Sequence, residues 1–464
     1  MKKVTDERLE KELKLSEEIE MGRVNELVPV LQKLPTIEVA EILSELSEGK
    51  LLEVLSMLTR EQQAQVFSDF DFDLQYLLFD RLDRWQFASI FEWVPSEIRA
   101  DFFQEISREE QIQLLPYLVK SVRKDVIELS KYPPETAGGI MSTDFATVIE
   151  TMTTNEAIAK VRADAPSQKM IYYIYVVDED MMMRGFVTLK DLILAEPNQM
   201  VSEILHSEYV YAEVEEDRET VAQKVEKYDL VAIPVLNNKR QLVGIVTHDE
   251  AIEVIRAEQT EDMEKFMGIV PDGEDVDYLG TTFWQHFKKR AAWLVSLAAL
   301  GIVSGFIIHR YETTLEEMII LALFIPMLAD AGGNSGSQAA TVVIRALSLG
   351  QLKVGDWLKI IWKECRIAVF LGLALGILAY GKVLVLSHGT ELPGDYGLPY
   401  VAFVIAIAIS IQVLTATVIG AVFPLFVKAM GGDPAVAASP AITTVVDVTG
   451  LLLYFGIAIL MLGL

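Results

Sequence analysis

The stretch PMLADAGGNSGSQAATVVIR, residues 326–345, decides how this chain is interpreted. It continues an apolar run, EEMIILALFIPML at 316–328, but turns small and polar from Asp330 to Gln338. Amides and hydroxyls facing lipid would be left without hydrogen bonds, at high cost. The pattern therefore predicts a membrane helix that faces protein or a water-filled path. A helix-packing seam is the alternative, but it explains the glycines and serines better than Asp, Asn and Gln together.

Charge divides the chain into two halves. The 464 residues carry a net charge of −27, yet 51% of them are hydrophobic. Residues 281–464 contain 11 basic and 10 acidic residues, which leaves 29 of the 40 basic and 57 of the 67 acidic residues in 1–280. We expect an acidic soluble half, which attracts cations and repels nucleic acid, joined to a neutral membrane half. The single cysteine, Cys365, excludes an internal disulfide, and the charged start of the chain predicts no cleavable signal.

The N-terminal part, residues 1–131, predicts an all-α superhelix. Residues 1–30 are expected to form one charged helix. From Leu34 onward, an apolar residue followed by a helix-capping type recurs every twelve residues. The pairs are Leu34-Pro35, Leu46-Ser47, Leu58-Thr59, Phe70-Asp71, Leu82-Asp83, Val94-Pro95 and Ile106-Ser107. This pattern indicates a scaffold of short stacked helices, in which the acidic residues are mostly helix caps or face a neighbouring domain.

Two similar α/β units are expected over residues 132–256. The sequence YVVD…RGFVT…D, which begins at Tyr175, recurs as IPVL…VGIVT…E, which begins at Ile233, and from the glycine-containing strand onward the offset is 59 residues. Each unit predicts a strand, a turn, a second strand and a capped helix. This pattern resembles a tandem pair of cystathionine-β-synthase (CBS) domains, which often bind adenine nucleotides between the repeats. The candidate nucleotide residues are Thr188 and Asp191, or Thr247 and Glu250.

A connecting helix and five apolar segments complete the chain. Residues 257–280 predict an acidic helix and loop, either a simple linker or an element that transmits force. Within the membrane domain, 281–464, each apolar segment is long enough to span a bilayer. The segments are roughly 291–308, 318–345, 365–386, 398–428 and 436–462. Lysine and arginine gather in the loops on one side, which predicts a cytoplasmic soluble half and an external C-terminus.

The last segment contains a second polar signal, Asp447 in ITTVVDVTG. A carboxylate inside a membrane helix by default marks an ion path, although a buried cap for another helix is the alternative. Thr443 and Ser439 lie one and two turns earlier on the same face. Asp433, before Pro434, is either a helix cap or a contact for the connecting helix. We find no zinc-like cluster and no nucleophile–base pair, so an enzyme is not expected, and the oxygen groups suit a hard, hydrated cation such as Mg²⁺.

Nearly the whole chain resembles the MgtE family of Mg²⁺ channels. The order of an acidic superhelix, the motif YPPETAGGIMSTDF, a CBS pair, an acidic helix, PMLADAGGNSGSQAAT and GGDPAVAASPAITTVVDVTG carries the resemblance. It implies a homodimer with one pore, lined by the second and fifth segments. The implied pore residues are Asp447, Asn334, Gly333, Ser337, Thr443, Ser439 and Asp330. Ser337 stands where some members have Asn, and Asp330 where some have Gly, so the resemblance does not fix which groups contact the hydrated ion.

The resemblance also implies closure by cytosolic Mg²⁺. The connecting helix matches the family's plug helix. The implied sensor residues are Asp217, Glu219, Asp229, Glu250, Glu253, Glu258, Glu261, Asp262 and Asp433. Charge supports this implication, because acidic cytoplasmic parts repel one another unless cations bridge them.

The expected function is therefore feedback-controlled Mg²⁺ import across the cytoplasmic membrane. Mg²⁺, membrane lipid and a second copy of the chain are the expected partners, with ATP at the CBS pair as an additional ligand and no nucleic acid. Two alternatives stay open. One is a broader pathway that also passes Co²⁺ or Mn²⁺, and the other is a nucleotide-sensing membrane receptor that conducts no ions.

Overall fold

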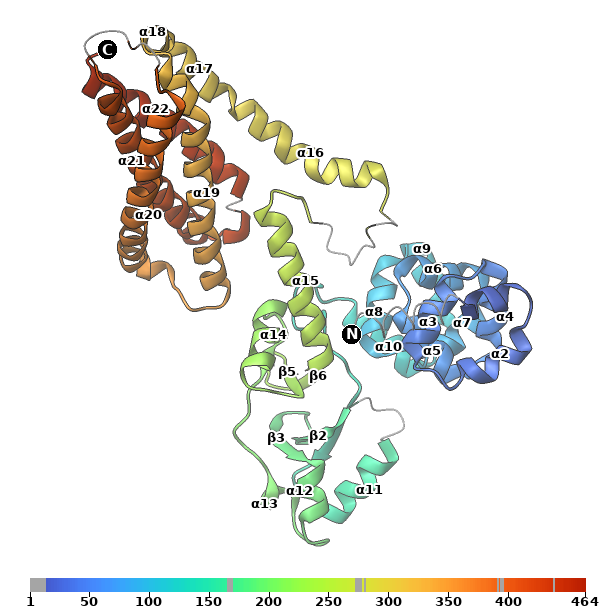
Figure 1. The fold of residues 1–464 in the computed structure, drawn as a ribbon. Helices are drawn as coiled ribbons and strands as arrows, with labels where there is room; N and C mark the ends of the chain where they lie inside the picture. The colour runs from blue at the N-terminus through green and yellow to red at the C-terminus, as the bar shows by residue number, and fades with distance from the viewer. Residues whose placement is uncertain are drawn as a thin grey trace. The chain divides into compact units, whose positions relative to one another are not determined.

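The computed structural model describes residues 14–164, 170–271, 278, 281–389, 392, 396–436 and 439–464. The chain forms two units, Met1–Ile255 and Arg256–Leu464. The first unit combines short helices with two small sheets, and the described part of the second unit is helical (Figure 1). The start of the first predicted helix, residues 1–13, and most of the predicted linker loop, at 272–277 and 279–280, lie outside the described residues.

Short helices follow one another at the predicted twelve-residue spacing. All seven residues expected at helix starts occupy the N-cap position, and Val119 continues the period. The side chains of Thr59, Asp71, Asp83 and Ser107 accept backbone N–H groups there. The helices are α2 (Val24–Leu31), α3 (Thr36–Ser44), α4 (Glu48–Met57), α5 (Arg60–Asp69), α6 (Phe72–Arg81), α7 (Arg84–Phe91), α8 (Ser96–Glu105), α9 (Arg108–Leu114) and α10 (Lys120–Leu129). The superhelical prediction is confirmed.

Long polar side chains cap the C-terminal ends of these helices. Gln63, Gln75 and Gln111 each donate to two carbonyls in the last turn of the preceding helix or just after it. Arg99 and Arg123 occupy the equivalent positions and also donate to carbonyls of the preceding segment. Because the last carbonyls of a helix have no partner within it, these side chains satisfy groups that would otherwise be buried and unpaired.

The prediction of one helix over residues 1–30 is wrong. The described helix over 14–20 ends in a turn, and α2 begins at Val24. Gly22 lies at the break with a φ of +94°, a conformation that glycine adopts more readily than other residues.

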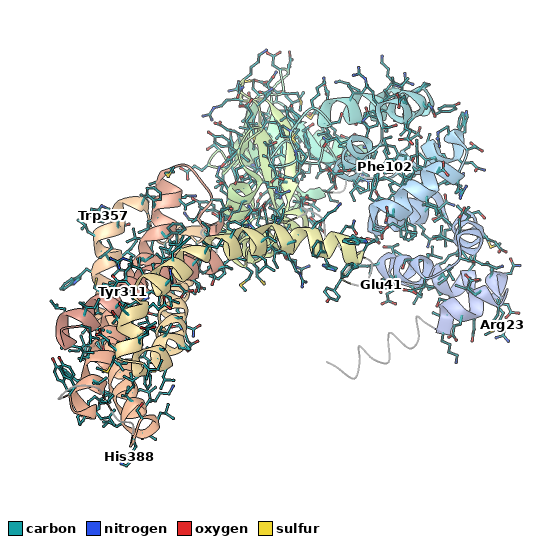
Figure 2. The ribbon with its side chains drawn as sticks, turned by 90° about the horizontal axis from the view of Figure 1, so that it is seen from above. Arg23, Glu41, Phe102, Tyr311, Trp357 and His388 are labelled. Carbon is teal, nitrogen blue, oxygen red and sulfur yellow. The ribbon has the colours of Figure 1, made fainter. Side chains whose placement is uncertain are left out.

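Five phenylalanines form the centre of the helical part, namely Phe67, Phe79, Phe87, Phe91 and Phe102. Their rings pack at centroid distances of 5.1–6.2 Å. Figure 2 labels Phe102 among these helices. This aromatic cluster lies within one continuous apolar core, so the stacked helices behave as a single packed body.

Two three-stranded sheets form the CBS pair. In each sheet the first strand pairs parallel to the second, and the second pairs antiparallel to the third. The pairs Val176–Gly185 and Val235–Gly244 match at the repeat offset found in the sequence. The strands are β1 (Phe145–Ile149), β2 (Met170–Val177), β3 (Met183–Thr188), β4 (Ala212–Glu213), β5 (Ala232–Leu236) and β6 (Leu242–Thr247). The helices are α11 (Thr154–Asp164), α12 (Leu189–Leu194), α13 (Val201–Ile204), α14 (Arg218–Lys227) and α15 (His248–Phe266).

The C-terminal unit is built from long apolar helices. They are α16 (Phe283–Leu300), α17 (Ile302–Arg310), the short α18 (Glu312–Glu317), α19 (Ile320–Ser348), α20 (Trp357–Leu386), α21 (Leu398–Ala429) and α22 (Ser439–Leu462). Four helical stretches of the described residues are long and apolar enough to cross a membrane: Phe283–Arg310, Val354–Leu386, Leu398–Ala429 and Ser439–Leu462. The remaining predicted span corresponds to α19, whose polar centre lowers its hydropathy, so the count of five spans stays a prediction.

Helices α19, α20, α21 and α22 lie side by side (Figure 1). Figure 2 shows Trp357 and His388 at opposite ends of this bundle. Small residues bring the backbones close together. A Cβ atom on Gly372 would lie 2.8 Å from the Ser410 carbonyl oxygen, and one on Gly336 would lie 3.1 Å from the Ala416 carbonyl oxygen. Glycine therefore lets α20 and α19 pack closely against α21, as in other membrane helix pairs.

Candidate functional site

The two predicted pore helices, α19 and α22, are direct neighbours. The Ser439 hydroxyl donates to the Ser337 hydroxyl at 2.8 Å. One turn further along each helix, a Cβ on Gly333 would lie 3.1 Å from the Thr443 methyl group. Four of the predicted pore residues, far apart in the sequence, thus meet across one antiparallel helix interface.

Another polar face of α19 points away from the packed core of its own chain. Asp330, Asn334 and Gln338 recur every four residues and are all exposed in the single chain. The Asn334 amide donates to the Asp330 carboxylate at 2.8 Å. A polar row on a helix this apolar is stable only against water or other polar groups.

Asp447 lines a cavity between four helices of the C-terminal unit. The cavity has a volume of about 170 Å³, and its wall includes Ser304 of α17, Ala329 of α19, Gln412 of α21 and Gly450 of α22. The Oδ1 atom of Asp447 is buried without a hydrogen-bond partner among the described residues. A buried carboxylate oxygen of this kind calls for water or a cation, and the cavity is large enough for several water molecules.

The C-terminal half of α15 contacts the membrane unit through an ion-pair network. The Lys265 ammonium lies 2.8 Å from the Asp433 carboxylate and 2.5 Å from that of Glu261. Asp433 also accepts the backbone N–H of Ala435, so both roles considered for it from the sequence are present. Burial disfavours the charged form of Lys265, but the bonds to Asp433 and Glu261 outweigh it and raise the lysine pKa.

Asp262 lies next to this network. The Ser348 hydroxyl of α19 donates to its carboxylate at 3.4 Å. Burial raises the pKa of Asp262, and the negative charge of Asp433 raises it further. Three of the predicted sensor acids, Glu261, Asp262 and Asp433, therefore converge here around one lysine.

The other predicted sensor acids are spread over the CBS pair and the first part of α15. Asp217 caps α14, Glu219 accepts from Gln223, and Asp229 follows α14 with a φ of +50°. Glu250, Glu253 and Glu258 lie along α15. In the part of the chain that the structure describes, no group of three or more His, Cys, Asp or Glu residues is arranged to hold a metal ion.

The candidate nucleotide residues Thr188 and Asp191 form a capping box at the start of α12. The Thr188 hydroxyl donates to the Asp191 carboxylate at 2.6 Å, and the His206 ring lies 3.0 Å from the same oxygen. Partial burial favours the neutral acid, but the hydrogen bonds from Thr188 and His206 keep the pKa of Asp191 low. Both residues thus have a structural role in the free chain.

Sequence reasoning missed two residues in these sites. The pattern of acidic residues alone does not point to Lys265, but its place four residues after Glu261 on one helix is a visible signal of an ion pair. Gln412, an amide inside the 32-residue apolar helix α21, was also a signal in the sequence. Only the fold shows that it lines the same cavity as Asp447.

Family models match stretches of the helical N-terminal part, the CBS pair and the membrane part of the chain. Residues 325–457 match MgtE, described as a divalent cation transporter, residues 34–135 match the MgtE intracellular N domain, and residues 137–198 and 201–257 match CBS domains. The magnesium transporter MgtE of Thermus thermophilus is 36% identical over 78% of this chain and 79% of its own length. That of Bacillus subtilis is 30% identical over 94% of each chain. This chain belongs to the MgtE family.

A solved structure agrees with this membership. The soluble part of a magnesium transporter is 26% identical, covers 54% of this chain and 99% of its own, and superposes with a TM-score of 0.50. The cytosolic domain of the Mg²⁺ channel MgtE, solved in complex with ATP, is 32% identical over 52% of this chain, with a TM-score of 0.49. The family, the helical N-terminal domain, the CBS pair and the multi-pass membrane unit predicted from the sequence are confirmed.

Proposed function

We propose that this MgtE-family protein is a Mg²⁺ channel that imports Mg²⁺ across the cytoplasmic membrane and is closed by cytosolic Mg²⁺. The observation that carries the proposal is the buried Asp447 oxygen, which has no hydrogen-bond partner among the described residues and lies beside a cavity lined by α17, α19, α21 and α22. The relatives named magnesium transporters support Mg²⁺ as the cargo.

The path consists of oxygen and amide groups. Asp447 supplies the negative charge, while Ser337, Ser439 and Thr443 supply hydroxyls, and Asn334 and Asp330 extend the polar surface along α19. Because Mg²⁺ loses its water reluctantly, the ion passes as a hydrated cation whose water molecules donate to these groups. The exposed polar row of α19 requires a polar neighbour, and a second copy of the chain across a shared pore provides one.

The cytoplasmic contact is the regulatory part of the proposal. Glu261, Asp262 and Asp433 offer the carboxylate oxygens that Mg²⁺ prefers, and in the single chain Lys265 compensates part of their charge. Mg²⁺ at this contact strengthens the attachment of α15 to the membrane unit, which favours the closed channel. The remaining sensor acids contribute at contacts between the cytoplasmic domains. The ion has to bind the closed state better than the open state.

The proposed orientation puts the N-terminal and CBS domains in the cytoplasm and the C-terminus outside, since Lys288, Lys289, Arg290 and the five basic residues between 345 and 366 carry most of the positive charge of residues 281–464. It requires α19 to cross the membrane in addition to the other four spans, which makes five in total. ATP at the CBS pair, near Thr188 and Asp191, is a secondary part of the proposal.

Flux measurements on reconstituted full-length protein test the pore assignment. Asp447→Asn should abolish Mg²⁺ uptake into liposomes, because the cavity loses its negative charge while its shape is kept. Thr444→Val is the matched control, since the Thr444 hydroxyl bonds only to the Pro440 carbonyl of its own helix in the described structure. Uptake by Asp447→Asn at the wild-type rate would refute the proposal.

The same assay separates the two alternatives. Equal uptake of Co²⁺ or Mn²⁺ by the wild-type protein would favour a broad divalent pathway. No uptake of any divalent cation, together with ATP binding to the soluble half, would favour a receptor without conduction.

A further inference from the structure

Gln412 is a buried amide in the middle of the most apolar part of the chain. Its side chain is 1% exposed, and α21 around it is mainly alanine, valine, isoleucine and leucine. Such an amide is costly unless it forms hydrogen bonds. Its Nε2 group donates to the Val446 carbonyl of α22 at 2.9 Å. Val446 is the residue directly before Asp447.

Two glycines make room for this amide. A Cβ on Gly332 of α19 would lie 2.6 Å from the Gln412 Nε2 atom, and a Cβ on Gly450 of α22 would lie 2.7 Å from its Cδ atom. Contacts this short are not tolerated, so a side chain at either position would displace the amide. Both predicted pore helices therefore lack a side chain where the Gln412 amide lies between them.

The amide and Asp447 share one cavity. Gln412, Asp447 and Gly450 all line the space of about 170 Å³ described above. The buried Oδ1 atom of Asp447 has no protein partner among the described residues, so no hydrogen bond to that atom fixes the carboxylate. Its depth and direction depend on how α22 is held, and Gln412 holds α22 one residue away.

We propose that Gln412 is a positioning residue for Asp447, which sets how tightly and how selectively the pore receives a hydrated divalent cation. This inference rests on the proposed function. Groups that orient a metal-binding side chain typically change metal affinity by about 10- to 100-fold when they are removed. A bond with a merely structural role would change the amount of folded protein instead and leave the concentration dependence of flux unaltered.

The test uses full-length protein in liposomes and measures Mg²⁺ uptake against external Mg²⁺ concentration, with Ca²⁺ as a competitor. Gln412→Met keeps the length of the side chain but removes the donor. Gly450→Ala keeps Gln412 but pushes its amide out of place. Ser410→Ala is the matched control, because Ser410 also lies in α21 and also donates to a neighbouring helix, at the Gly372 carbonyl of α20, away from α22.

The expected result is an increase of about tenfold or more in the half-saturating Mg²⁺ concentration for both variants, with weaker discrimination against Ca²⁺. Ser410→Ala should keep the wild-type values. Thermal unfolding of each purified protein shows which variants fold. If Gln412→Met does not fold, the flux of Gly450→Ala tests the inference. An unchanged half-saturating concentration in a folded variant, or an equal change in Ser410→Ala, would overturn the inference.

Asp447→Asn in the same assay distinguishes a failure of the positioning role from a failure of the pore assignment. If Asp447→Asn abolishes uptake while both Gln412→Met and Gly450→Ala match the wild type, the positioning role fails and the pore assignment stands. If Asp447→Asn transports normally, the pore assignment itself fails.

Discussion

Lys265 gives the sharpest prediction, because one side chain ties the connecting helix to the membrane unit. Its ammonium bonds to Asp433 at 2.8 Å, and the side chains of the pair are 24% and 36% exposed. Fully exposed ion pairs contribute up to about 1 kcal/mol, whereas hydrogen bonds to charged groups contribute about 1.5–3 kcal/mol. This partly buried pair lies between those cases, so we take about 1.4 kcal/mol, which is a factor of about ten in an equilibrium.

We predict that Lys265→Met raises the ratio of open to closed channels about tenfold when no Mg²⁺ is present on the cytoplasmic side. The substitution removes the bond to Asp433 and leaves Glu261, Asp262 and Asp433 to repel one another. Saturating Mg²⁺ should still close the channel, because the same carboxylates then bind the ion without competition from an ammonium group. The difference in open probability between zero and saturating Mg²⁺ therefore becomes larger.

Patch recordings of the full-length protein, with the cytoplasmic face exchanged between zero and saturating Mg²⁺, measure this ratio. Lys265→Arg should stay close to the wild type. Lys359→Met is a matched control, since Lys359 forms an equally short pair with Asp356 but its own side chain is 85% exposed. An unchanged open fraction at zero Mg²⁺, or loss of closure at saturating Mg²⁺, would show that this lysine does not hold the contact as we describe.

Two further predictions concern pH and the stability of the helical domain. The pKa of Asp262 is raised, so its negative charge opposes the contact at high pH, and this opposition fades as the pH falls through the raised pKa. The open probability at zero Mg²⁺ should therefore decrease on acidification. Asp262→Asn should remove this part of the pH dependence in patch recordings. Gln75→Leu should destabilise the packing of α5 on α6 by about 1–3 kcal/mol, because the Phe67 and Phe70 carbonyls lose their donor. Faster hydrogen exchange of the backbone at 67–75 would reveal this destabilisation. The control Gln113→Leu, at an exposed position, should exchange like the wild type. Equal exchange in both variants would count against this role of Gln75.

Local chemistry in the sequence was enough to predict most of the architecture. The twelve-residue period of caps predicted where each short helix begins, because Ser, Thr, Asp and Pro satisfy helix starts through neighbouring residues alone. The repeated strand pattern predicted the CBS pair, and charge separated the soluble half from the membrane half. The break at Gly22 was missed because the charged residues on both sides have high helical propensity, although glycine itself is a typical helix-ending residue.

The sites depend on residues that the sequence places far apart, and only the tertiary structure brings them together. Asp447 was identified by its cost in an apolar segment, but no local pattern pairs Gln412 with Val446 or seats its amide between Gly332 and Gly450. Likewise, Lys265 and Asp433 meet only when the chain folds. Composition and periodicity report the needs of one segment, whereas hydrogen bonds and ion pairs between segments depend on distances that packing alone sets.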